Sequence, residues 1–260
     1  MIMRRYHPFF FVLFILISAG SSDGRELDPT TASLKIEAYQ YYYGNERPVD
    51  YTQALYLYRQ AAERGDAEAQ YIVGGMYYTG KGIDPDKKKG FKWLISAAEQ
   101  GKTSPESLAI IGSMLLSGQE IPQNYLEAKK WLTQAVKQGS LTAQRDLAYL
   151  YYHGLGGNLD YKKALELYEK AALQGDTMAQ SNAGLMYATG TGTNRDKARG
   201  YAWYSLAASS GNAFAIKNRN NLMLDMTWEE LNQAQALSFE LYRRIEKIHA
   251  RDSFAPMAPQ

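Results

Sequence analysis

Glycine recurs along this chain in two columns, and this repetition constrains the fold more than any other feature. The two columns stand 21 residues apart in every copy, and successive copies are spaced by 36, 38, 36 and 36 residues. The columns are Gly44, Gly80, Gly118, Gly154 and Gly190, and Gly65, Gly101, Gly139, Gly175 and Gly211. Self-similarity at such a period is typical of proteins built from stacked repeats, so the chain predicts five of them.

A helix is predicted between the two glycines of every repeat. An Asp or Asn stands six residues after the first glycine, and these residues favour helix N-caps because a side-chain oxygen accepts from a free amide of the first turn. The five caps are Asp50, Asp86, Asn124, Asp160 and Asp196. Apolar residues follow at offsets of three and four, which places them on one helical face. The second glycine then ends the helix.

A second helix is predicted before the first glycine of every repeat. It carries a small residue six places before that glycine and a larger one three places before it, the pattern of close helix packing. One hairpin cannot bury its face alone, so neighbours must stack. We therefore expect an all-α fold, an α/α superhelical solenoid of five helix-turn-helix repeats. The repeats lie at about 30–65, 66–101, 102–139, 140–175 and 176–211.

The third repeat departs from the others. It has two extra residues near Ser104 and Pro105, which suit an N-cap and the first helical position. Glu120 replaces a second glycine of the turn that stands at Gly82, Gly156 and Gly192 elsewhere. These changes indicate a local change in superhelical curvature.

Residues 213–250 are predicted to form a C-terminal pair of capping helices. Thr227 and Glu230 have the spacing of a capping box, and the helix that they begin is expected to run to about His249. A polar outer face is expected here, because it stops solenoids from stacking end to end. The tail at 251–260 is predicted to be disordered.

Residues 1–22 have the features of a secretory signal peptide. Arg4 and Arg5 give a positive start, residues 9–17 are apolar, and small residues follow at 18–22. An uncleaved anchor is the alternative, although nine apolar residues fall well short of the roughly 20 that span a bilayer. Cleavage predicts a periplasmic or secreted protein without stable membrane insertion.

Charge and cysteine content exclude several kinds of protein. Without residues 1–22 the chain has 27 basic and 27 acidic residues, which argues against a nucleic-acid partner because phosphate binding needs excess positive charge. There is no cysteine. Disulfides, thiolate metal sites and lipid attachment at a signal-peptide cysteine are therefore excluded.

The repeat resembles the Sel1-like repeat, a relative of the tetratricopeptide repeat. The residues that carry the resemblance in the fifth copy are Gly184, Tyr187, Gly190, Gly192, Asp196, Lys197, Ala198, Trp203, Tyr204, Ala207, Ala208 and Gly211. The resemblance implies an adaptor that binds proteins. Exported members include inhibitors of sensor kinases, envelope-assembly factors, host-interaction proteins and immunity proteins. A cysteine-rich branch has been linked to β-lactamase activity, but this chain lacks its cysteines.

No pattern in the sequence indicates catalysis. The only histidines are His7, His153 and His249, and none has a partner at metal-ligand spacing. No serine has the context of a nucleophile elbow. We expect a non-enzymatic protein with no metal, cofactor or catalytic residue. A hydrolase of envelope substrates is the alternative from another class.

Tyrosines are predicted to form the partner-binding site. If the first helix of each repeat lines the concave surface, as in tetratricopeptide repeats, tyrosine is dense in the exposed columns of the first, second and fourth repeats. The candidates are Tyr39, Tyr42, Tyr43, Tyr71, Tyr78, Arg145, Tyr149, Tyr152 and His153. Tyrosine suits binding because it offers a large contact area and a polar tip with few torsions to fix. Packing of these rings between adjacent hairpins is the alternative.

Overall fold

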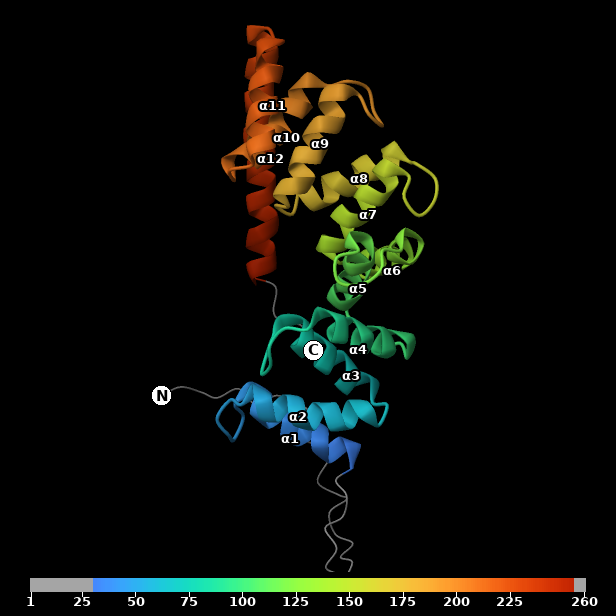
Figure 1. The fold of residues 1–260 in the computed structure, drawn as a ribbon. Helices are drawn as coiled ribbons and strands as arrows, with labels where there is room; N and C mark the ends of the chain where they lie inside the picture. Colours follow the sequence, from blue (N-terminus) through green and yellow to red (C-terminus); the bar gives the residue numbers. More distant parts are fainter. Residues whose placement is uncertain (1–29, 255–260) are drawn as a thin grey trace, which may run out of the picture.

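The computed structural model describes residues 30–254, in which every regular element is an α-helix (Figure 1). The helices are α1 (Thr31–Tyr43), α2 (Tyr51–Glu63), α3 (Ala67–Thr79), α4 (Lys87–Glu99), α5 (Pro105–Ser117), α6 (Tyr125–Lys137), α7 (Leu141–His153), α8 (Tyr161–Ala172), α9 (Thr177–Thr189), α10 (Lys197–Ser209), α11 (Ala213–Leu224) and α12 (Trp228–Phe254). The expected signal segment, residues 1–22, lies outside the described residues.

The predicted N-caps begin the second helix of every repeat. Asp50 accepts hydrogen bonds from the backbone amides of Thr52 and Gln53, both at 3.0 Å, and Asp160 accepts one from Lys163 at 2.9 Å. In the third repeat, Ser104 and Ser107 form a reciprocal capping box and Pro105 takes the first turn of α5. These caps confirm the helical hairpins, because each satisfies an amide that the helix itself leaves free.

The small residues of the first helices receive large side chains from the second helices. A Cβ added at Gly74 would lie 2.8 Å from Leu94 Cγ, and one at Gly112 would lie 2.5 Å from Leu132 Cγ. Such distances leave no room for a methyl group. The two helices of a hairpin therefore pack at a separation that larger residues would not allow, as the sequence predicts.

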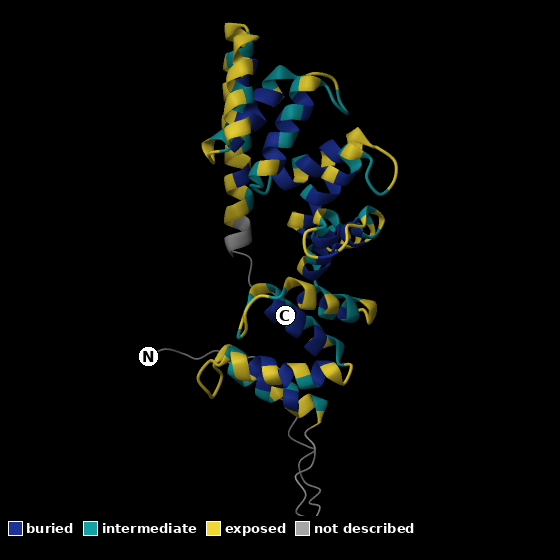
Figure 2. Cartoon of the chain, in the orientation of Figure 1, coloured by how far each residue is buried: buried dark blue, intermediate teal, exposed yellow. Residues whose placement is uncertain are grey.

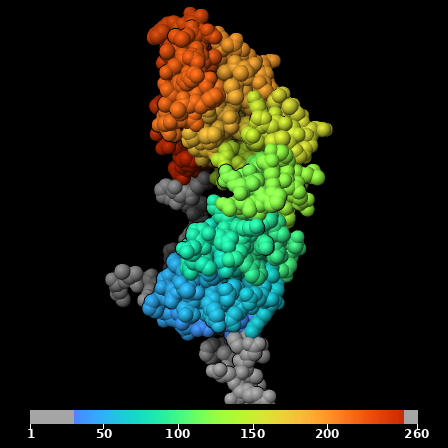
Figure 3. Space-filling view, viewed as in Figure 1, coloured from blue at the N-terminus to red at the C-terminus, as the bar shows by residue number. Residues whose placement is uncertain are grey.

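The hairpins stack in chain order, so each repeat touches its neighbours (Figures 1 and 3). The buried residues lie where the helices of the stack face one another (Figure 2). They divide into one cluster on α1–α3, a central cluster from α4 to α10 that α12 also joins, and one on α10–α12. The fold is thus a solenoid, and its core is a chain of local cores.

The C-terminal helices close the stack. Glu230 accepts a hydrogen bond from the Thr227 amide at 2.8 Å, and Thr227 accepts one from the Glu230 amide at 3.2 Å, as the predicted capping box requires. Helix α12 packs on α10 and runs back along the stack, where His249 Nε2 lies 3.1 Å from the Gln174 carbonyl oxygen (Figure 1).

Two expectations for the C-terminal region differ from the structure. Helix α12 runs to Phe254 rather than ending near His249, because the first residue that disfavours helix is Pro256. The outer face is not uniformly polar, since Leu224 is 80% exposed and Trp228 is 74% exposed. Residues 255–260 of the predicted tail lie outside the described residues.

Candidate partner-binding site

The nine candidate residues lie on three first helices. Tyr39, Tyr42 and Tyr43 belong to α1, Tyr71 and Tyr78 to α3, and Arg145, Tyr149, Tyr152 and His153 to α7. The structure brings the α1 and α3 residues onto neighbouring helices, whereas α7 lies two repeats further along (Figure 1). The candidates therefore form two groups rather than one continuous surface.

The α1 residues of the first group form an aromatic cluster in repeat 1. Ring centroids of Tyr39 and Tyr43 are 4.5 Å apart, and those of Tyr42 and Tyr43 are 4.9 Å apart. The Tyr42 ring also meets the edge of Tyr51, at the start of α2, at 5.3 Å. Tyr39 and Tyr43 are 44% and 63% exposed, so this cluster presents ring surface to solvent.

The second group reproduces this arrangement three repeats later. Ring centroids of Tyr149 and His153 are 4.3 Å apart, and those of Tyr152 and His153 are 5.0 Å apart. The Tyr152 ring meets Tyr161, at the start of α8, at 5.3 Å. We call the two sets cluster 1 (Tyr39, Tyr42, Tyr43, Tyr51, Tyr58) and cluster 4 (Tyr149, Tyr152, His153, Tyr161, Tyr168).

Each cluster rests on a buried tyrosine of the second helix. Tyr58 is 3% exposed and Tyr168 is 2% exposed. Burial raises the pKa of both hydroxyls well above the usual value, and neighbouring tyrosines of each cluster add to the shift. Burial also raises the pKa of Tyr43. The hydroxyls of Tyr43, Tyr58 and Tyr168 therefore stay protonated at physiological pH.

Arg145 and Tyr71 tie adjacent repeats together. Both occupy the same column of the first helix, and both reach the N-cap of the next first helix. Arg145 pairs with Asp176 at 3.0 Å and with Asp146 at 3.1 Å, while the Tyr71 hydroxyl donates to Ser104 at 3.2 Å. These contacts show a structural role for the column. Pairing of Arg145 with an acid of a partner stays a prediction.

The exposure of the remaining candidates follows their register. Tyr149 is 43% exposed and His153 is exposed, whereas Tyr42, Tyr78 and Tyr152 are half-buried. The backbone of Gly90 lies against Tyr78, since a Cβ there would be 3.2 Å from Tyr78 Cβ. The exposed candidates have ring surface that a partner could contact. The half-buried candidates pack against the fold with one part of the ring and are exposed with another.

The structure adds three residues to the candidate site that the columns of the first helices could not reveal. Tyr51 and Tyr161 come from second helices, and Lys81 comes from the turn of the following repeat. The sequence does contain a signal for the two tyrosines. The position seven residues after the first glycine is aromatic in repeats 1, 3 and 4, at Tyr51, Tyr125 and Tyr161.

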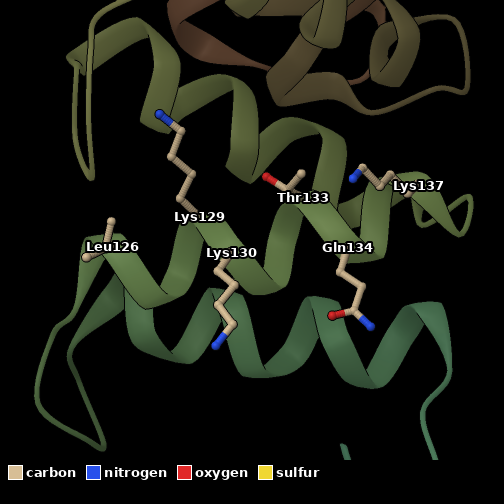
Figure 4. Close-up of a pocket in the computed structure, with 6 residues that line it drawn as sticks. All are labelled: Leu126, Lys129, Lys130, Thr133, Gln134 and Lys137. Atoms are coloured by element: carbon tan, nitrogen blue, oxygen red, sulfur yellow. The ribbon is translucent and has the colours of Figure 1, made fainter. Parts of the chain in front are cut away.

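Open grooves elsewhere have a different character. One lies along α6 and is lined by Leu126, Lys129, Lys130, Thr133, Gln134 and Lys137. Lys129 and Lys130 point to opposite sides of the helix, so their charges do not converge on one point (Figure 4). Among the side chains of residues 30–250, no three His, Asp or Glu residues come together in a way that could hold a metal ion. No helix in that range is long and apolar enough to cross a bilayer.

The stacked hairpins, the glycine turns and the capping hairpin define an α-solenoid of short helical repeats. The model of the Sel1 repeat matches residues 38–66, 67–102, 105–140, 141–176 and 177–212. The chain therefore belongs to the Sel1 repeat family. Proteins of this family mediate protein–protein interactions, and the fold is generally not enzymatic.

Solved structures share this fold. A Sel1 repeat protein from Oxalobacter formigenes is 28% identical with a TM-score of 0.60, over 79% of this chain and 85% of that one. A protective antigen of uropathogenic Escherichia coli strains is 25% identical with a TM-score of 0.56. The match covers 88% of this chain but only 56% of the antigen, so the chain spans little more than half of that relative. No curated protein sequence matches the chain.

Proposed function

We propose that this protein is a non-enzymatic binding module of the bacterial cell envelope that holds a segment of another protein against its first helices. The observation that carries the proposal is the pair of matching clusters with exposed rings in repeats 1 and 4. Exposed tyrosines on rigid helices give a large contact area at a low cost in side-chain entropy. The concave face of the solenoid is the surface that we assign to the partner.

Affinity capture from an envelope fraction tests this assignment. The variants are Tyr39→Ala with Tyr43→Ala in cluster 1, and Tyr149→Ala with His153→Ala in cluster 4. Loss of a hot-spot aromatic costs roughly 2 kcal/mol, so each variant should weaken capture by about thirtyfold. Tyr56→Ala is the matched control, because Tyr56 is 54% exposed but lies on α2 outside both clusters.

Melting curves separate binding from folding in this test. All four truncated rings are exposed, so the variants should melt within a few degrees of the parent. Weaker capture at an unchanged melting temperature supports the proposal. Equal capture by every variant, or the same loss in Tyr56→Ala, refutes it. The captured protein distinguishes an immunity protein from a sensor-kinase inhibitor or an assembly adaptor.

Export is the second part of the proposal. Its basis is the signal-like segment at residues 1–22. Mass spectrometry of protein from the periplasm should find an N-terminus between about residues 19 and 25, the zone expected for signal cleavage. An intact Met1 in the membrane pellet would contradict cleavage.

A further inference from the structure

A lysine from the turn of repeat 2 lies on the rings of cluster 1 in repeat 1. The Lys81 ammonium is 4.8 Å from the centroid of Tyr42 and 5.3 Å from that of Tyr51. It also donates a hydrogen bond to the Tyr42 hydroxyl at 2.9 Å. The two rings and one hydroxyl thus form a receptor for a primary ammonium, which is held by cation–π attraction and by one polar contact.

The turn between α3 and α4 brings Lys81 to this place. Gly82, with φ +76°, lies directly on the start of α2, and a Cβ there would be 2.4 Å from the Tyr51 carbonyl oxygen. The Thr52 hydroxyl donates to the Gly82 carbonyl at 3.3 Å. Only glycine fits such a contact at a positive φ, so the residue before it is fixed above the tyrosine pair.

Repeat 4 has the same receptor without the lysine. Gly192, also at φ +76°, lies on the start of α8, and a Cβ there would be 2.6 Å from the Tyr161 carbonyl oxygen. Tyr152 and Tyr161 meet at 5.3 Å and 65°, against 5.3 Å and 72° for Tyr42 and Tyr51. The position of the lysine is taken by Thr191, whose hydroxyl lies 2.7 Å from that of Thr189.

The tyrosine pair is confined to these two repeats. The corresponding pairs are Tyr78 and Lys87 in repeat 2, Leu116 and Tyr125 in repeat 3, and Ala188 and Lys197 in repeat 5. Turn geometry alone therefore does not require two tyrosines here. The pair in repeat 4 is a feature in its own right, separate from the general architecture of the repeat.

The rings of the repeat-4 pair are accessible. Tyr161 is 37% exposed and Tyr152 is half-buried. The nearby lysines are engaged elsewhere, since Lys129 and Lys163 lie over Tyr151 at 4.3 and 4.7 Å. Among the described residues no cation lies over Tyr152 or Tyr161, and neither hydroxyl has a hydrogen-bond partner.

We propose that Tyr152 and Tyr161 bind the side-chain ammonium of a lysine of the partner protein, in the manner in which Tyr42 and Tyr51 hold Lys81. This inference rests on the proposed function, because it names the chemistry that one subsite of the binding face recognises. The partner lysine supplies the charge that Thr191 lacks, and its ammonium donates to the Tyr152 hydroxyl. Asp160, the N-cap of α8, adds a carboxylate beside Tyr161 in the sequence.

A titration with a defined probe tests the subsite without the partner. The probe is an end-blocked Gly-Lys-Gly peptide, added to protein whose tyrosine rings carry ¹³C, and the control is the same peptide with Nε-acetyl-lysine. Exposed cation–π contacts strengthen binding only about two- to fivefold. Below saturation, the ring resonances of Tyr152 and Tyr161 should therefore shift about two to five times further with the charged peptide than with the acetylated one. Shifts of equal size with both peptides would overturn the proposal.

An exchange of residues between the two repeats sharpens the test. Thr191→Lys should place an internal ammonium on the pair and abolish the response of Tyr152 and Tyr161. Thr191→Ser is its control and should respond like the parent. Lys81→Thr should make the rings of Tyr42 and Tyr51 newly responsive. An unchanged response in Thr191→Lys would show that the peptide binds elsewhere.

The outcome is readable even if Thr191→Lys does not fold. Tyr161→Leu removes one ring, while Gly192 contacts the backbone of that residue, so the turn should stay in place. It should abolish the response of Tyr152, and a persisting response overturns the proposal. A failed peptide titration with capture still sensitive to cluster 4 refutes this subsite alone. A successful titration with capture insensitive to both clusters refutes the proposed function instead.

Discussion

Repeats 1 and 4 build almost the same aromatic cluster, but only in repeat 1 is the tyrosine pair covered by a lysine, which comes from the following repeat. Both clusters rest on a buried tyrosine, Tyr58 or Tyr168, and in both a turn glycine of the following repeat touches the start of the cluster's second helix, α2 or α8. The difference lies at one turn position, Lys81 against Thr191. The contacts that the two repeats share maintain the solenoid. The position at which they differ determines which side chains the solenoid exposes to a partner.

The largest expected effect comes from the buried tyrosines. Tyr58→Ala and Tyr168→Ala should each cost roughly 3–5 kcal/mol, because each removes a fully buried aromatic ring and leaves a cavity. Because each repeat has its own local core, hydrogen exchange should rise first around the substituted repeat. Uniform opening of all repeats in either variant would contradict the division into local cores.

The next largest loss of stability is expected at the turn glycines. Gly82→Ala and Gly192→Ala place a methyl group within 2.4–2.6 Å of a carbonyl oxygen at a positive φ, which should cost about 1–3 kcal/mol. Gly65→Ala is the matched control, since φ is +88° there but no atom lies within 4 Å. Denaturant titration measures all three. A loss in Gly65→Ala as large as in the other two would show that φ, and not the contact, determines the cost.

Ion pairs between repeats should make the stability of repeats 1 and 4 respond differently to high pH. Lys35 pairs with Asp66 at 3.0 Å, as Arg145 pairs with Asp176. Burial opposes the charge on Lys35, but its bonds to Glu68 and Asp66 prevail and raise its pKa. A raised lysine pKa stabilises the fold below the unfolded value of 10.5, and this contribution is lost as pH rises through the folded pKa.

Arginine keeps its charge in the same range, so repeat 1 should lose about 0.5–1 kcal/mol more than repeat 4 above pH 10.5. Both buried tyrosines also have raised pKa values and lower the stability of the two repeats alike at high pH, whereas the raised pKa of Tyr43 adds a loss in repeat 1. Hydrogen exchange of α1 and α7 at pH 9 and pH 11, corrected for intrinsic rates, measures the difference. Lys35→Arg should reduce the difference and leave the part that comes from Tyr43, and equal losses in the parent protein would contradict the assignment.

The smallest effect is expected at the exposed rings. Tyr43→His and His153→Tyr exchange the residues by which the two clusters differ at this position, and each should change stability by less than about 0.5 kcal/mol. Thermal melting of both variants checks this.

Tyr78→Ala should lower the stability more than Tyr149→Ala, since Tyr78 packs against Gly90 while Tyr149 is 43% exposed. The reverse order would mean that exposure does not report packing here.

The sequence predicts the helices well because their ends are determined locally. Caps such as Asp50 and Ser104, and glycines that follow the helices, act within one or two turns. The same local patterns place Tyr39, Tyr43 and Tyr149 on exposed faces. They do not reveal Lys81 over Tyr42 and Tyr51, because that contact joins adjacent repeats through a turn.

The C-terminal helices show the same limit. The capping box at Thr227 predicts where α12 begins, but its exposed apolar residues, such as Trp228, follow no repeat column. Likewise, the column that contains Lys35, Tyr71 and Arg145 is predicted as exposed surface. In the structure these three side chains of the column reach the N-cap of the next repeat, a contact that depends on how hairpins stack.

Site-specific photocrosslinking in living cells tests the central claim, that both clusters face one partner, most directly. A benzophenone amino acid replaces Tyr43, His153 or, as the control, Tyr56, all of which are exposed. We expect crosslinks to the same protein from positions 43 and 153, and none to it from position 56. Crosslinks only from position 56, or different proteins at positions 43 and 153, would contradict the account.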